Sequence, residues 1–174
     1  MRYLVLVCLL IVGCKNSGRG NPPWPTQDLT IYDSGSDATR EAIKPVLKIA
    51  GMRVAAWVEI PKREMSFDDW FAWSQANTGG FPYAGILTRP LFNDGLFWTY
   101  GYAAAVCARG DRRVSVSSWD DRNIPASRTA LLHELGHLLG APHDTKGAMT
   151  RENNGELWFS RRSVIKILGC FNQG

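Results

Sequence analysis

The distribution of apolar residues along the chain predicts alternating strands and helices. Residues 29–32 form a short apolar run that is typical of a buried strand, and residues 52–60 form a second run rich in Val and Ala. Between them, Ser36 or Asp37 can cap a helix that continues to about Ala50. A strand, a helix and a strand at this spacing predict two parallel strands joined by a right-handed crossover.

The rest of the chain continues this mixed pattern. Small and apolar residues on both sides of a polar turn at 108–111 predict a hairpin, and a leucine-rich segment predicts a longer helix. Ser127 can cap this longer helix, and Ser160 can cap a last helix that ends at Gly169. In chain order, we expect a helix at 67–75, strands at 83–88, 102–107 and 113–117, a helix from about 127 to 139 and a helix at 161–168.

The first residues are typical of an export signal. One positive charge, Arg2, precedes an apolar run at 4–12 that is too short for a permanent membrane span. The run ends in Ile11-Val12-Gly13-Cys14, which resembles the lipobox of bacterial lipoproteins. That resemblance implies a signal peptide at 1–13 and a lipid on Cys14. A plain signal peptide or an uncleaved anchor is the alternative.

A lipid on Cys14 would place the protein at the bacterial envelope. Lys15 follows the cysteine where many inner-membrane lipoproteins carry Asp, so a Gram-negative cell would send this chain to the outer membrane. Without the lipid, we expect a secreted protein. Residues 14–27 are rich in Gly, Ser, Asn and Pro and should form a flexible tether between the lipid and the domain.

Composition limits the remaining possibilities. Residues 28–174 are sufficient for one domain with one core. The net charge of the full chain is +4, which is too mild to predict a nucleic-acid partner. We therefore expect a monomer without nucleic acid.

All three histidines of the chain lie in one short segment, His133-Glu134-Leu135-Gly136-His137-Leu138-Leu139-Gly140-Ala141-Pro142-His143-Asp144. His133 and His137 are four residues apart, so a helix places both imidazoles on one face, where they can bind one zinc ion. Glu134 is poorly placed as a further ligand and better placed as a general base beside that ion. The alternative is an ordinary core helix with incidental histidines.

The residues that follow allow a third ligand. Gly140 can adopt the left-handed conformation that ends a helix, and Pro142 prevents the helix from resuming. The chain can then turn back and offer His143. Three protein ligands leave the fourth position of a zinc ion for water, which is the arrangement of a catalytic site.

The complete pattern HExxHxxGxxH, followed by Met149, resembles the zinc signature of the metzincin metallopeptidases. Asp144, directly after the third histidine, is similar to the adamalysin branch, and the short segment before Met149 is closer to the matrixins. The resemblance implies an α+β (α/β) fold with a twisted mixed sheet, an antiparallel edge strand, an active-site helix and a small C-terminal subdomain that ends in a helix. It also implies that Met149 lies beneath the metal without binding it.

The resemblance extends to the hairpin before the zinc helix. In metzincins the edge strand pairs with extended substrate, and small side chains at Ala103, Ala104 and Ala105 would let a peptide approach closely. Packing beneath another element is an equally good explanation for these residues. An exported chain with Cys107 and Cys170 left over also suggests one disulfide, which adamalysins carry at similar positions; two free thiols are the alternative.

These observations predict a zinc-dependent metalloendopeptidase with one catalytic Zn²⁺ ion and protein or peptide substrates. Glu134 would be the catalytic base, and His133, His137 and His143 the metal ligands. Two other functions stay open: a catalytically silent lipoprotein that keeps zinc for stability and acts as a binding module, and a zinc hydrolase of a non-peptide envelope substrate.

Overall fold

The computed structural model describes residues 21–33, 35, 37–61, 65–77, 83–88, 92–93, 98–99, 101–103 and 113–172. The expected signal peptide, Cys14 and the rest of the expected tether up to residue 20 lie outside these residues, as do Ala104, Ala105 and Cys107. Lipidation and the pairing of Cys107 with Cys170 therefore stay predictions. Within the described part of the chain, none of the helices combines the length and apolar character needed to cross a bilayer.

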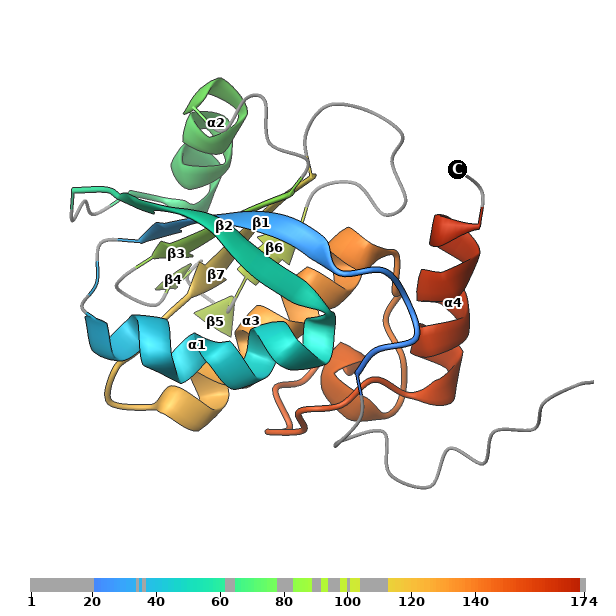
Figure 1. Ribbon diagram of the computed structural model, residues 1–174. Coiled ribbons are helices and arrows are strands. Elements are labelled where there is room, and N and C mark those ends of the chain that lie inside the picture. The colour runs from blue at the N-terminus through green and yellow to red at the C-terminus, as the bar shows by residue number, and fades with distance from the viewer. Residues whose placement is uncertain are drawn as a thin grey trace, which may run out of the picture.

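A five-stranded mixed sheet forms the centre of the fold (Figure 1). Its strand order is β2-β1-β3-β7-β6, and the first four strands run parallel. The short strand β6 runs antiparallel to β7 at one edge, with Tyr102 opposite Val116. The strands are β1 (Gln27–Asp33), β2 (Met52–Glu59), β3 (Tyr83–Thr88), β6 (Gly101–Ala103) and β7 (Arg113–Ser118), and β4 (Phe92–Asn93) pairs separately with β5 (Trp98–Thr99).

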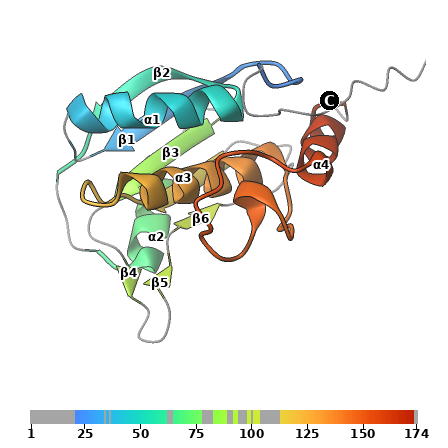
Figure 2. The same ribbon diagram turned by 90° about the horizontal axis from the view of Figure 1, so that it is seen from below.

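Helices cover both faces of the sheet (Figures 1 and 2). Helices α1 (Asp37–Ala50) and α3 (Ile124–Leu139) pack against each other on one face, and α2 (Phe67–Asn77) lies on the opposite face. The expected strand–helix–strand unit is present as β1, α1 and β2, with β1 and β2 parallel. The chain after α3 makes a short helix η1 (Gly147–Met149) and ends in α4 (Arg161–Phe171).

Two apolar clusters hold these layers together. The larger cluster fills the space between the sheet and helices α1 and α3, and the smaller one lies between the sheet and α2. Alternate residues of β1 contribute to different clusters, because successive side chains of a strand point to opposite faces: Ile31 belongs to the larger cluster and Tyr32 to the smaller one. The zinc-signature helix is therefore fixed against the main core.

The packed chain begins earlier than the expected boundary at residue 28. Trp24, in the segment expected to be a tether, is 5% exposed, and its indole nitrogen donates a hydrogen bond to the Ala50 carbonyl oxygen at 3.0 Å. Its ring also contacts Phe159, with 6.0 Å between ring centroids. The Pro- and Asn-rich composition around Trp24 concealed a residue that belongs to the core.

Two helix boundaries also differ from expectation. Helix α3 begins at Ile124 with Asn123 as its N-cap, because the Asn123 side chain accepts a hydrogen bond from the Ala126 amide. Ser127 instead lies inside the first turn and bonds to the backbone of Asp120. Helix α4 continues past Gly169 to Phe171, because that glycine keeps helical geometry.

Candidate metal centre

Helix α3 carries the first two histidines into the middle of the molecule. Its leucines are almost fully buried in the main core, which fixes the rotation of the helix about its axis. His133 and His137 project from another side of the helix and are half-buried. The buried face is formed by Leu131, Leu132, Leu135, Leu138 and Leu139.

Gly140 ends α3 and redirects the chain, as expected. Its φ of 104° lies in the left-handed region, and its amide donates to the carbonyl of His137. The Ala141 amide then donates to the Gly136 carbonyl at 2.8 Å, which secures the turn. Beyond Pro142 the chain returns along the helix and brings the exposed His143 to the two helical histidines.

The three imidazoles converge on one point. The ring centroids of His133 and His137 are 4.6 Å apart, and the ring of His143 lies 5.2 Å from the first and 4.7 Å from the second. One ring nitrogen from each histidine can serve as a ligand, and these nitrogens lie within 4.8 Å of one another. Among the described residues, this is the one group of three or more His, Cys, Asp or Glu side chains close enough to hold a metal ion.

Backbone carbonyls set the tautomers of two of the rings. The Nδ1 of His133 lies 2.7 Å from the Ala148 carbonyl oxygen, and the Nδ1 of His137 lies 2.8 Å from the Ala141 carbonyl oxygen. A carbonyl oxygen only accepts, so each Nδ1 must carry the proton, and each neutral ring presents a lone pair at Nε2. Carbonyl partners of this kind are typical of histidines that bind metals.

The donor atoms fit a zinc ion. The two Nε2 atoms of His133 and His137 are 3.0 Å apart, so two lone pairs face each other unless a cation lies between them. Two nitrogens at tetrahedral positions about 2.1 Å from zinc would lie roughly 3.4 Å apart. Protonation is a poor substitute for the metal, because burial and the neighbouring histidines lower the pKa of His137 to about 4. Burial also lowers the pKa of His133.

Glu134 is the buried acid of the site. Its side chain is 5% exposed, and burial raises its pKa to about 8. The edge strand β6 covers it, since a Cβ built on Gly101 would lie 2.8 Å from a Glu134 carboxylate oxygen and 2.8 Å from the Val116 carbonyl oxygen. Gly101 therefore provides the space that Glu134 occupies, and the sequence analysis did not identify this glycine.

Met149, in η1, packs against Gly136 of the helix that carries the first two histidines. It is fully buried, and its sulfur occupies the space next to Gly136 where any side chain would collide. The Ala148 carbonyl that orients His133 belongs to the same short helix. Because Ala148 and Met149 are adjacent, the burial of Met149 also fixes the carbonyl that orients His133. Gly136 allows α3 to approach η1 this closely.

Asp144 connects the His143 turn to the last helix. Its carboxylate accepts hydrogen bonds from Ser160 and from Ser163, and these bonds keep its pKa below the usual range. Its backbone amide donates to the Met149 carbonyl at 2.8 Å. Ser160 is also the N-cap of α4, so Asp144 fixes the C-terminal segment against the turn that carries His143.

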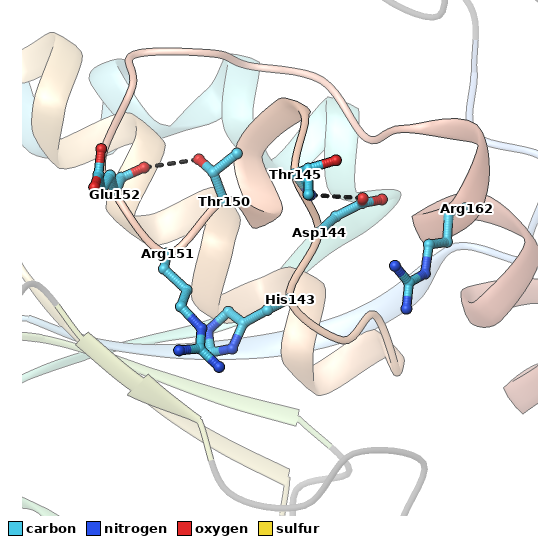
Figure 3. A pocket seen from close by; sticks show the side chains of 7 residues that line it. All are labelled: His143, Asp144, Thr145, Thr150, Arg151, Glu152 and Arg162. Atoms are coloured by element: carbon cyan, nitrogen blue, oxygen red, sulfur yellow. Dashed lines mark hydrogen bonds between the residues drawn. The ribbon is translucent and has the colours of Figure 1, made fainter.

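A pocket of about 430 Å³ opens beside His143 (Figure 3). It is lined on one side by the residues after Met149 and on another by the first turn of α4. Burial and, to a lesser degree, the positive charge of Arg151 lower the pKa of His143. The lining residues are His143, Asp144, Thr145, Thr150, Arg151, Glu152 and Arg162.

The other expected substrate contacts are only partly described. Ala103 in β6 is half-buried and packs against the larger apolar cluster, which agrees with the explanation that its small side chain fits beneath another element. Cys170 lies in α4. Nothing local in the sequence marks Ala141, Ala148 and Arg151, because their interactions with the histidines depend on the turn geometry after α3. Arg162 reaches the same pocket only through the packing of α4.

The fold and the histidine cluster together define an α/β protein with three histidines placed to hold one metal ion. No protein-family model matches the chain. Its structure is similar to the crystal structure of archaemetzincin from Methanopyrus kandleri, with a TM-score of 0.63 and 16% sequence identity. The match covers 87% of this chain and 98% of the archaemetzincin chain. The protein therefore has the fold of a protein whose name places it among the metzincins.

Proposed function

We propose that this protein is a zinc-dependent endopeptidase that hydrolyses peptide bonds of protein substrates. The observation that carries the proposal is the convergence of three neutral imidazoles beside a buried carboxyl group. His133, His137 and His143 would hold one zinc ion and leave a position for water. The structural similarity to an archaemetzincin supports the same class of hydrolase.

Each residue of the site has a defined role in this proposal. Bound zinc would polarise the scissile carbonyl and lower the pKa of a water molecule to about 7. His133 and His137 keep fixed orientations, because their Nδ1–H groups donate to Ala148 and Ala141. Met149, fully buried against Gly136, would supply an apolar floor for the site.

Glu134 would act as general base and then as general acid. A cation at the neighbouring histidines favours its ionised form, which offsets the burial that otherwise raises its pKa. The Glu134 carboxylate would take a proton from the attacking water and later deliver it to the leaving amine. The cover that β6 provides over Glu134 keeps this proton transfer away from bulk water.

The cellular setting is part of the proposal. Export and a lipid on Cys14 would hold the enzyme at an envelope membrane, where nearby proteins would be its substrates. We propose a monomer, because the site is built from one chain segment between His133 and Met149.

The decisive experiment compares the full chain with its Glu134→Gln variant. Both proteins should bind one zinc per chain, measured by metal analysis, and only the unchanged protein should cleave denatured protein. Zinc in both and cleavage by neither would favour the silent binding module. Cleavage of cell-wall fragments but not of protein would favour the non-peptide hydrolase, and equal cleavage by both proteins would remove Glu134 from the mechanism.

A further inference from the structure

The pocket beside His143 contains two arginines that form no ion pair with an acidic side chain in the described part of the chain. Arg151 and Arg162 both line it, and both are exposed at the surface. Neither makes an ion pair with any residue in the described part of the chain, although four other acid–base pairs are present there. Two guanidinium groups at one pocket without a carboxylate partner provide unused hydrogen-bond donors with fixed positive charge.

The two acidic residues at the same pocket are not hydrogen-bonded to these arginines, although the charge of Arg162 helps to lower the pKa of Asp144. The Asp144 carboxylate is occupied by Ser160, Ser163 and the Thr145 amide. In Figure 3, Glu152 points away from the guanidinium groups, and the one contact drawn for it uses its backbone oxygen, which accepts from Thr150. The guanidinium donors of Arg151 and Arg162 are therefore still available to a ligand, and no acidic side chain among the described residues pairs with Arg151.

The position of the pocket connects this charge to the metal centre. In the view of Figure 3, His143 lies between Arg151 and Arg162, with the Arg151 side chain reaching back toward the imidazole. Arg151 is close enough for its charge to act on that ring. A substrate group that enters the pocket would thus be held directly beside the third metal ligand.

We propose that this pocket is a carboxylate-binding subsite, formed by Arg151 and Arg162, that selects acidic peptides for the metal centre. The proposal rests on the proposed peptidase function. A guanidinium group binds a carboxylate through paired charge-assisted hydrogen bonds, which are stronger than neutral ones. The volume of about 430 Å³ accommodates an Asp or Glu side chain with part of the peptide around it.

The carboxylate can come from two sources. An acidic side chain near the cleaved bond would be bound in an internal position of the substrate. A free C-terminal carboxylate would instead place the end of the peptide in the pocket. Peptides with a C-terminal amide distinguish these sources, because they keep the side chain and lose the terminal charge.

The test measures binding in the full-length Glu134→Gln variant, loaded with zinc, which cannot turn over its ligand. Short fluorescein-labelled peptides that carry Glu or Gln at one varied position, each with a free or an amidated C-terminus, are titrated by anisotropy. We expect a charged peptide to bind about tenfold more tightly than its uncharged counterpart, with the ratio falling as salt is added.

Matched variants assign the effect to the pocket. Arg151→Gln and Arg162→Gln should each reduce the affinity ratio of the charged to the uncharged peptide toward one. Arg151→Glu should reverse the preference, so that a Lys peptide binds more tightly than the Glu peptide. Arg161→Gln is the control, since Arg161 lies in the same turn of α4, is exposed and does not line the pocket. Equal binding of charged and uncharged peptides, or an equal loss in the Arg161 control, would overturn the subsite.

Cleavage measured in parallel with unchanged Glu134 separates the two proposals. A charge preference in binding without cleavage would support the subsite and contradict the peptidase. Cleavage without any charge preference would support the peptidase and contradict the subsite.

Discussion

Raising the pH should destabilise the zinc-free protein through Glu134. The carboxyl group is 5% exposed beneath β6, and burial raises its pKa from 4.5 to about 8. Between these two values the folded protein keeps a proton that the unfolded chain has released. Stability rises with pH only where the unfolded state binds more protons, so this group makes stability fall across that range.

The size of the effect follows from the pKa difference. A shift of one unit corresponds to about 1.4 kcal/mol, so a difference of about 3.5 units gives at most about 5 kcal/mol. The contribution of protonated Glu134 to the free energy of unfolding is fully present below about pH 4.5 and is lost as the pH rises through about 8. A loss of this size is comparable to the whole stability of many small domains.

Urea denaturation of the zinc-free protein and of its Glu134→Gln variant, from about pH 5 to about pH 9, isolates this effect. His137 acts in the opposite direction, because its lowered pKa of about 4 makes stability rise with pH up to about 6.5. The His137 contribution is the same in both proteins, so it cancels when the unfolding free energy of one is subtracted from that of the other. With zinc bound, the difference should shrink, since a nearby cation favours the ionised carboxylate.

If the zinc-free protein and Glu134→Gln show the same change in unfolding free energy with pH, the carboxyl group is not desolvated. The cover provided by Gly101 and β6 would then be wrong as a description of the site.

Three further substitutions test the packing around the site. Gly101→Ala should lower kcat at least tenfold while zinc content measured by metal analysis is unchanged, because the added methyl collides with Glu134. Gly136→Ala should cost about 1–3 kcal/mol in urea denaturation through overpacking against the methionine floor; Gly169→Ala, with open space around it in α4, is the control and should be neutral or stabilising. Trp24→Ala should cost about 3–5 kcal/mol and lower the Tm, and a Tm equal to that of the unchanged protein would show that Trp24 does not belong to the core.

The convergence of the three histidines could be predicted from the sequence because its parts are local. His133 and His137 share a helix face, and Gly140 and Pro142 dictate a turn that returns His143 to them. Helix periodicity and the left-handed preference of glycine are properties of short segments, so no knowledge of the rest of the fold was needed.

Other features could not be predicted because they depend on contacts between distant segments. Gly101 has no signature of its own, and its role appears only when β6 lies over Glu134. Trp24 was hidden in a segment whose composition is typical of a tether, and only tertiary contacts with Ala50 and Phe159 give it partners. The start of α3 was misplaced because Asn123 and Ser127 are both good caps, and Ser127 bonds to Asp120 instead.

The contact between Trp24 and Phe159 has a consequence for the order in which the chain can fold. Trp24 leaves the ribosome long before Phe159, the aromatic residue that packs against it, is synthesised. The Phe159 ring lies against Gly136, below the histidine helix. During translation the sheet and its first helices can form from local contacts, whereas the floor of the metal centre must wait for residues from both ends of the described chain. Folding of the site is therefore a late event, and a truncated nascent chain would expose an apolar surface where the finished protein holds its histidines.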